Sequence, residues 1–143
     1  MLFLETAEGN FPINAINALA KICVEAEKTL DHRRLYSDLR LYCPQPLSVA
    51  ETIASSAVNT VLGTPVELIV VFSETGRMTR LVAKYRPPVA ILALCPTVKG
   101  ESTVTKGIQT VKYLSTTRGV IAHALSKDDM QLNMIQTVFS LLF

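Results

Sequence analysis

Two apolar runs near the middle of the chain enclose a polar turn and a short basic segment. The first run is Val66–Phe72 and the second is Val89–Cys95. Nearly continuous apolar runs of this length are typical of strands that are covered on both faces, as in parallel sheets. The segment from about Arg77 to Tyr85 predicts a short helix, which ends at Arg86–Pro88 because proline cannot continue a helix. The pattern therefore predicts a strand, a turn at Ser73–Gly76, a helix and a second strand.

Apolar residues at helical spacing predict two helices before this unit. The first begins at Pro12, a residue that suits the first turn of a helix, and ends near Leu30. The second follows Ser48, which forms a capping box with Glu51, and it ends at Gly63. In such a box the serine hydroxyl and the carboxylate each accept a hydrogen bond from a free backbone N–H at the helix start.

A further helix, strand and helix are predicted after the central unit. The helix begins at Ser102 or Thr103 and runs to about Leu114, and the strand is Gly119–Leu125. A last helix runs from about Asp128 to the C-terminus. Strands that alternate with helices are characteristic of α/β proteins with a parallel sheet. We therefore expect an α/β layer sandwich with a mostly parallel sheet.

The segment of residues 31–47 differs from its surroundings. It is charged, has no obvious pattern and is closed by Pro44 and Pro46. Such a composition predicts an irregular linker at a domain boundary. We therefore expect three parts, namely residues 1–30, the linker, and a domain of residues 48–143.

Composition narrows the classes of protein to consider. The net charge of +2 is too small to indicate nucleic-acid binding. No apolar run approaches the length of a membrane span, and Glu5 and Glu8 lie where a secretory signal would carry positive charge. We expect a cytoplasmic protein with neither nucleic acid nor membrane as partner. The hydrophobic fraction of 49% is high for a soluble monomer and indicates that part of the surface is buried against another protein.

The cysteines and histidines predict no metal site. Cys23, Cys43 and Cys95 have no metal-ligand spacing and are expected to be free thiols. Cys23 and Cys95 lie in apolar patterns, which predicts core positions for both. His32 and His123 are isolated, which favours structural or solvated roles.

The turn after the first strand has the features of an anion site. The backbone N–H groups of a turn and the positive end of a helix dipole converge there, at the edge of a parallel sheet where ligands usually bind. Glu74 and Met78 supply a negative charge and an apolar side chain at the same place. An ordinary polar loop with a helix cap is the alternative. The candidate ligand-binding residues are Ser73, Thr75, Gly76 and Arg77, with Thr79 as a further hydroxyl.

Four segments resemble one enzyme family, pyruvate kinase. SETGRMTRLVAKYRPPVAILAL resembles a turn, helix and strand of the C-terminal domain of that family, and PLSVAETIASSAVNTV resembles the helix before it. TTRGVIAHAL resembles a later strand, and ETAEGNFPINAINALAKICVEAE resembles the segment that closes the catalytic barrel. The resemblance covers most of residues 1–125 in consistent order.

The resemblance implies the end of a (β/α)8 barrel followed by a three-layer α/β/α domain that lacks its last strands. The family transfers a phosphoryl group from phosphoenolpyruvate to ADP with magnesium and potassium, as a homotetramer. Most of the barrel has no counterpart here, so the resemblance implies a fragment or truncated form that is not catalytic alone and has no cofactor of its own. It implies partnership with itself or with full-length subunits. A sugar-phosphate effector would bind at Ser73, Thr75, Gly76 and Arg77.

Overall fold

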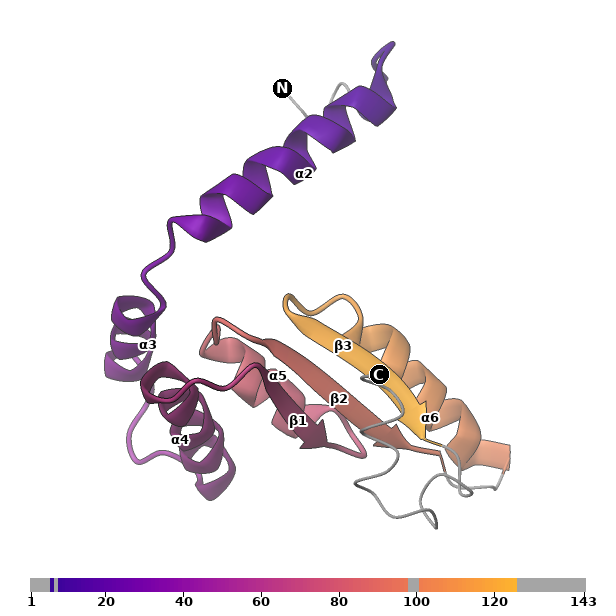
Figure 1. Cartoon of the computed structure of the whole chain (residues 1–143). Coiled ribbons are helices and arrows are strands. Elements are labelled where there is room, and N and C mark those ends of the chain that lie inside the picture. Colours follow the sequence, from indigo (N-terminus) through magenta and orange to yellow (C-terminus); the bar gives the residue numbers. More distant parts are fainter. Residues whose placement is uncertain (1–5, 7, 98–100, 126–143) are drawn as a thin grey trace. The chain divides into compact units, whose positions relative to one another are not determined.

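The computed structural model describes residue 6, residues 8–97 and residues 101–125 (Figure 1). The chain divides into two compact units, Met1–Asp31 and His32–Phe143. None of the helices in the described part is long and apolar enough to cross a membrane.

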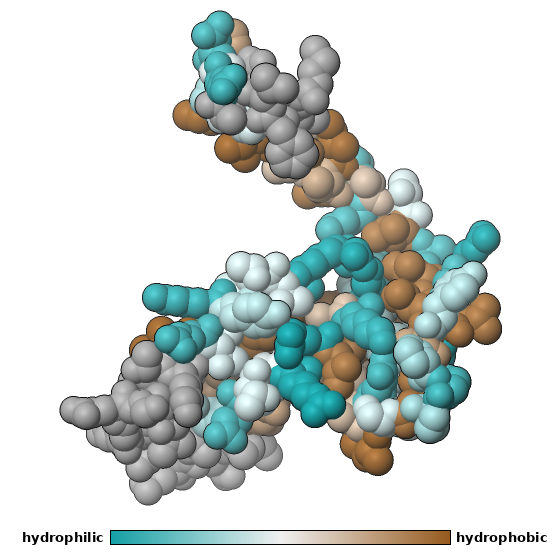
Figure 2. All heavy atoms as spheres, turned by 180° about the vertical axis from the view of Figure 1, so that it is seen from behind, coloured by the Kyte–Doolittle hydropathy of each residue, from teal (hydrophilic) through white to brown (hydrophobic). Residues whose placement is uncertain are grey.

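The first unit consists mainly of one helix, α2, which spans Pro12–Lys28. Pro12 occupies its first turn, as predicted, and the helix ends at Thr29, whose N–H and hydroxyl both donate to the carbonyl of Ala26. Ala15 is the buried residue of this helix. Most of its large apolar side chains are exposed (Figure 2).

From α4 onward the second unit alternates helices and strands in the predicted order, and a further helix, α3, precedes α4. Its elements are α3 (His32–Leu41), α4 (Val49–Gly63), β1 (Leu68–Phe72), α5 (Arg77–Lys84), β2 (Ala90–Pro96), α6 (Glu101–Leu114) and β3 (Val120–Leu125). The strands form one sheet in the order β1-β2-β3, and both pairings are parallel. The α/β class and the parallel sheet are confirmed. The helix predicted from about Asp128 lies outside the described residues.

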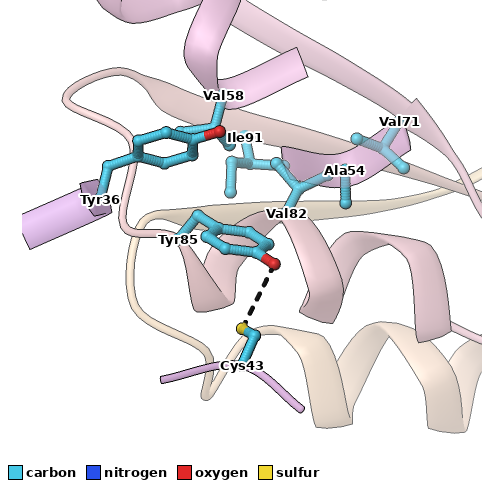
Figure 3. Close-up of a cluster of buried hydrophobic side chains, with 8 residues drawn as sticks. All are labelled: Tyr36, Cys43, Ala54, Val58, Val71, Val82, Tyr85 and Ile91. Carbon is cyan, nitrogen blue, oxygen red and sulfur yellow. Dashed lines mark hydrogen bonds between the residues drawn. The ribbon is translucent and has the colours of Figure 1, made fainter. Parts of the chain in front are cut away.

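Both crossover helices cover the same face of the sheet (Figure 1). Right-handed crossovers that step across a sheet in one direction place their helices on one side. Val71 and Ile91 pack on this face against Val82 of α5 and Val58 of α4 (Figure 3). Farther along the strands, Leu114 of α6 covers the same face at a second apolar cluster. On the opposite face, a separate apolar cluster contains the buried residues Leu92, Leu94 and Leu125.

The prediction of an irregular linker is wrong for residues 32–41, which form α3. Tyr36 of this helix is buried, and its ring centroid lies 5.6 Å from that of Tyr85. The Tyr36 hydroxyl donates to the carbonyl of Ser55 at 3.1 Å, and Arg40 donates to the Ser55 hydroxyl at 2.8 Å. Most residues of α3 are charged or polar, so its narrow apolar stripe, which packs on α4 and α5, was not recognised in the sequence. The division into domains at residues 31–47 stays a prediction.

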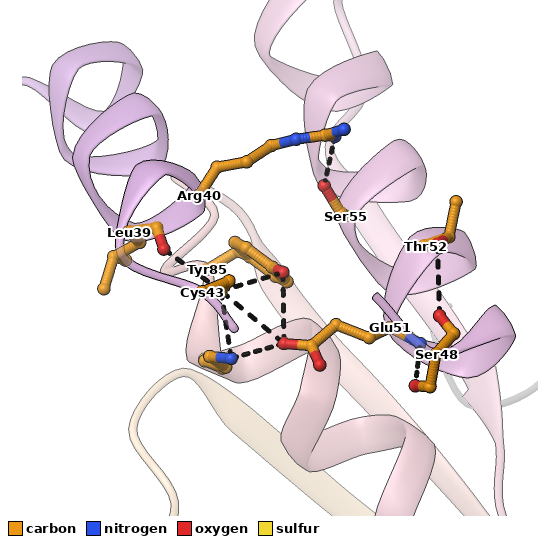
Figure 4. A network of polar contacts seen from close by, with 9 residues as sticks. Leu39, Arg40, Cys43, Ser48, Glu51, Thr52, Ser55 and Tyr85 are labelled. Atoms are coloured by element: carbon orange, nitrogen blue, oxygen red, sulfur yellow. Dashed lines mark hydrogen bonds and ion pairs between the residues drawn. The ribbon is translucent and has the colours of Figure 1, made fainter. Parts of the chain in front are cut away.

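The capping box is confirmed in one half only. Ser48 Oγ accepts from the backbone N–H of Glu51 at 3.2 Å. The Glu51 carboxylate turns instead toward α5, where it accepts from Lys84 Nζ and, at 3.3 Å, from the Tyr85 hydroxyl (Figure 4). Lys84 also donates to Cys43 Sγ at 3.2 Å. This polar cluster therefore ties the end of α5 to α4 and to the turn after α3.

The contacts within the cluster favour the charged forms of Glu51 and Lys84. The hydrogen bond from Lys84 lowers the pKa of Glu51, and the same bond raises the pKa of Lys84. Burial raises the pKa of the Tyr85 hydroxyl, which therefore remains a hydrogen-bond donor at neutral pH. A carboxylate whose pKa is lowered on folding stabilises the fold above its ordinary pKa and loses that contribution as the pH falls through its folded pKa.

We predict that Glu51→Gln lowers the melting temperature by a few degrees at pH 7, because the amide keeps the hydrogen-bond geometry but removes the charge. The difference in melting temperature between the variant and the unaltered chain should shrink as the pH falls below 4.5, the ordinary pKa of the carboxyl group. Thermal unfolding followed by circular dichroism between pH 7 and pH 2.5 measures both values.

The matched control is Glu25→Gln, which removes a carboxylate paired with Lys28 on the exposed surface of α2. Exposed pairs contribute little, so this change should leave the melting temperature nearly unaltered. If Glu51→Gln lowered the melting temperature by the same amount at every pH, the charge of Glu51 would not be what stabilises the fold.

Candidate functional site

The predicted anion turn lies between β1 and α5, and the sheet holds its start in place. The backbone N–H of Ser73 donates to the carbonyl of Leu94 in β2 at 3.0 Å, and the Ser73 side chain is buried. Gly76 follows with a φ of +72°, in the left-handed region. A Cβ at this position would lie 3.2 Å from the Leu114 side chain. The backbone conformation therefore favours glycine, and a Cβ here would also require the Leu114 side chain of α6 to shift.

The first turn of α5 offers free backbone donors. Gly76 is the N-cap of this helix, and no side chain caps it. The backbone N–H of Arg80 donates to the carbonyl of Gly76 at 3.1 Å, so the N–H groups of residues 77–79 precede the first intrahelical bond. Such groups, at the positive end of the helix dipole, form a site for an anion.

The predicted side chains divide between surface and core. Thr75 and Arg77 are exposed beside the free N–H groups, as is Glu74, whereas Ser73 is buried. Thr79 is fully buried, and its hydroxyl has no hydrogen-bond partner. The turn can thus present one exposed hydroxyl, one guanidinium and several backbone donors to a ligand.

Arg80 does not join the turn. Its guanidinium lies 5.4 Å from the centre of the Tyr113 ring and donates to the Tyr113 hydroxyl at 3.2 Å. These contacts hold the side chain against α6. Arg80 also lines a cavity of about 310 Å³ with Ala83, Lys84, Arg86, Thr117 and Arg118. The sequence analysis missed this cavity, because its residues come from two segments that only the fold brings together.

A metal site among the described residues would require a cluster of side chains that bind metal ions. Nowhere in this part of the chain do three His, Cys, Asp or Glu side chains gather closely enough to hold a metal ion. Cys43 and Cys95 are buried free thiols, and burial raises the pKa of Cys95. Cys23 is exposed, so its predicted core position is wrong. It lies on the exposed helix α2.

Comparison with known proteins identifies the fold. Residues 51–142 match the model of the family described as "Pyruvate kinase, alpha/beta domain". The chain is 43% identical over 124 residues to pyruvate kinase of Dictyostelium discoideum, a match that covers 85% of this chain and 22% of that protein. It is 45% identical over 94 residues to a probable cytosolic pyruvate kinase isozyme of Arabidopsis thaliana, covering 66% of this chain and 19% of the relative.

Solved structures give the same result. The crystal structure of Cryptosporidium parvum pyruvate kinase superimposes with a TM-score of 0.73 and 31% identity, over 97% of this chain and 26% of that one. The chain thus spans about a quarter of the length of the pyruvate kinases it matches. The family match extends over more than half of the chain, and the relatives match both of its units in sequence. The chain belongs to the pyruvate kinase family and carries the α/β domain of that family.

Proposed function

We propose that this chain serves as an effector-binding C-terminal domain of pyruvate kinase and that the turn from Ser73 to Arg77 binds the phosphate of a sugar-phosphate effector. The uncapped start of α5 is the observation that carries the proposal. A phosphate there would accept from the free N–H groups, from the Thr75 hydroxyl and from the Arg77 guanidinium. Arginine suits this role because its planar fork matches two phosphate oxygens at once.

Glu74 sets the strength of this binding. Its carboxylate is exposed in the same turn, next to Thr75. A like charge about 5 Å from a phosphate costs on the order of 1 kcal/mol or more at an effective dielectric constant near 20. The turn of this chain should therefore bind a phosphate more weakly than the same turn with a neutral residue at position 74.

We predict that fructose 1,6-bisphosphate binds to the 143-residue chain and that Arg77→Gln weakens the affinity by about tenfold or more, since one charge-assisted hydrogen bond is worth about 1.5–3 kcal/mol. Glu74→Gln should strengthen binding. Isothermal titration calorimetry at two salt concentrations measures both effects, and binding should weaken with added salt.

Lys21→Gln is the matched control, because it removes one exposed positive charge from α2 and lies in neither the turn nor the cavity. It should leave the affinity for the sugar bisphosphate within about twofold. The proposal fails if millimolar sugar bisphosphate gives no heat, or if Arg77→Gln leaves the affinity unchanged.

We further propose that the chain does not transfer phosphoryl groups on its own. The pyruvate kinase reaction, from phosphoenolpyruvate to ADP with magnesium and potassium, belongs to proteins about four times as long. Among the described residues no three His, Cys, Asp or Glu side chains form a cluster for a metal ion, and we assign no step of that reaction to them. We also propose that the chain is cytoplasmic. The name of the Arabidopsis relative describes that protein as a cytosolic isozyme, which supports this proposal.

A coupled assay with lactate dehydrogenase tests the absence of catalysis. The purified chain with phosphoenolpyruvate, ADP, Mg²⁺ and K⁺ should give a rate indistinguishable from a blank without protein. A full-length pyruvate kinase added to the same mixture verifies that the assay works. Turnover well above the blank that scales with the concentration of the chain would refute the proposal.

A second candidate function is self-association through α2, which one observation favours. Its large apolar side chains Ile13, Ile16, Leu19 and Ile22 recur every three residues and are 40–73% exposed. Most of the stability of helices in proteins comes from the packing of apolar side chains on a partner, so this helix is expected to have one. We propose a second copy of this chain as that partner, which agrees with the high hydrophobic fraction.

We predict that the chain sediments as a dimer or larger species at about 100 μM, a concentration at which modest apolar interfaces of micromolar affinity are occupied. The double variant Ile16→Lys with Ile22→Lys should shift it to a monomer. Analytical ultracentrifugation decides the outcome. The paired control Lys21→Ala changes a charged residue of the same helix and should leave the association intact. A monomer for the unaltered chain would rule this function out.

A further inference from the structure

The cavity at the C-terminal half of α5 concentrates positive charge. Four of its six lining residues are cationic, and they come from α5, from the segment before β2 and from the segment before β3. The parallel pairing explains the convergence. Ile91 of β2 pairs with Val120 of β3, so the two segments that lead into these strands arrive at the same edge of the sheet. The cationic residues are Arg80, Lys84, Arg86 and Arg118.

The contacts of Lys84, Arg80 and Arg86 show how these three side chains bring positive charge to the cavity. Glu51 balances Lys84 in an ion pair. Arg80 is held by Tyr113, which orients the guanidinium without neutralising it. Arg86 is exposed and brings a further full charge to the same space. Three arginines line the cavity, and guanidinium groups that share a cavity repel one another, so a bound anion would relieve that repulsion.

The backbone of Arg86 is held in a conformation that arginine rarely adopts. Its φ is +49°, in the left-handed region, which costs a non-glycine residue free energy. Its N–H donates to the carbonyl of Ala83 at 3.0 Å, and its carbonyl lies 2.9 Å from His32 Nδ1. The backbone at the cavity wall is thus fixed from both sides. Strain of this kind gathers at binding sites, because a fixed backbone places a side chain before the ligand arrives.

The segment before β3 is also held by backbone hydrogen bonds. The backbone N–H of Thr117 donates to the carbonyl of Leu114 at 2.9 Å, and the carbonyl of Thr117 accepts from Val120 at 3.2 Å. The Thr117 side chain adds a hydroxyl to the cationic lining. Guanidinium groups and a hydroxyl are the donors with which proteins recognise phosphate, and about 310 Å³ is the size of a small ligand pocket.

We propose that this cavity is a second anion site, which binds a small phosphorylated molecule. It is separate from the turn at Ser73–Arg77, since the two lie at opposite ends of α5, a helix of 8 residues. It does not depend on the sugar-phosphate proposal, because no residue of the turn lines the cavity.

Titration of the 15N-labelled 143-residue chain with inorganic pyrophosphate, followed by amide NMR, tests the proposal. The amides of Thr117, Arg118 and Gly119 should shift and saturate. Arg86→Asn should weaken the affinity at least about tenfold, the loss expected for one charge-assisted hydrogen bond. Asparagine tolerates the left-handed backbone, so this variant should keep its melting temperature. Arg118→Gln should weaken binding similarly.

Arg77→Gln is the matched control, because it removes one exposed arginine from the other end of the same helix. Its affinity for pyrophosphate at the cavity should stay within about twofold of the unaltered chain. The proposal is overturned if pyrophosphate at 10 mM, roughly the weak limit for specific sites, shifts no cavity amide. It is also overturned if Arg77→Gln abolishes binding while Arg86→Asn does not, because the anion would then lie at the turn. Equal weakening by Arg77→Gln, Arg86→Asn and Arg118→Gln would indicate non-specific attraction and would overturn it as well.

Discussion

The burial of β2 on both faces is the constraint on which the second unit depends. Residues Ile91–Cys95 are all buried, and neighbours on either side of the strand are apolar. Because β2 lies between β1 and β3, its register fixes where each loop and each helix terminus emerges. The turn at Ser73 is held by the carbonyl of Leu94, and the segments carrying Arg86 and Arg118 meet because their strands pair. Both candidate sites therefore follow from the position of one strand.

Helix α5 connects the two sites, and contacts with α3 and α4 hold it in place. Its C-terminal end is tied to α4 by the Lys84–Glu51 ion pair, and Tyr85 packs against Tyr36 of α3. A helix of 8 residues has too few intrahelical hydrogen bonds to be stable alone. Tertiary contacts must supply its stability. The polar cluster around Glu51 thus supports the geometry of the turn and of the cavity, although it contributes no residue to the turn.

The sequence alone predicted the elements whose apolar residues are continuous or strongly periodic, and it missed features that depend on long-range contacts. The strands and the first helix follow from local pattern. The helix α3 was missed because its apolar stripe is narrow and charged residues surround it, and contacts such as Tyr36 with Ser55 hold it in place. The turn was predictable because Ser73, Thr75, Gly76 and Arg77 are nearly consecutive. The cavity was not, because Arg86 and Arg118 become neighbours only through strand pairing.

The contact between Gly76 and Leu114 also limits how this domain can evolve. Leu114 is completely buried in the apolar cluster that it forms with Ala93 and Cys95, and the backbone of Gly76 lies against its side chain. A larger residue 76 would meet the Leu114 side chain and would also have to adopt the left-handed backbone, so a smaller residue 114 removes only one of the two obstacles. The loop that would determine ligand preference and the helix that covers the sheet cannot diversify independently. Variation in ligand preference should accordingly be concentrated at the exposed positions of the turn, where a side chain can change without disturbing the core.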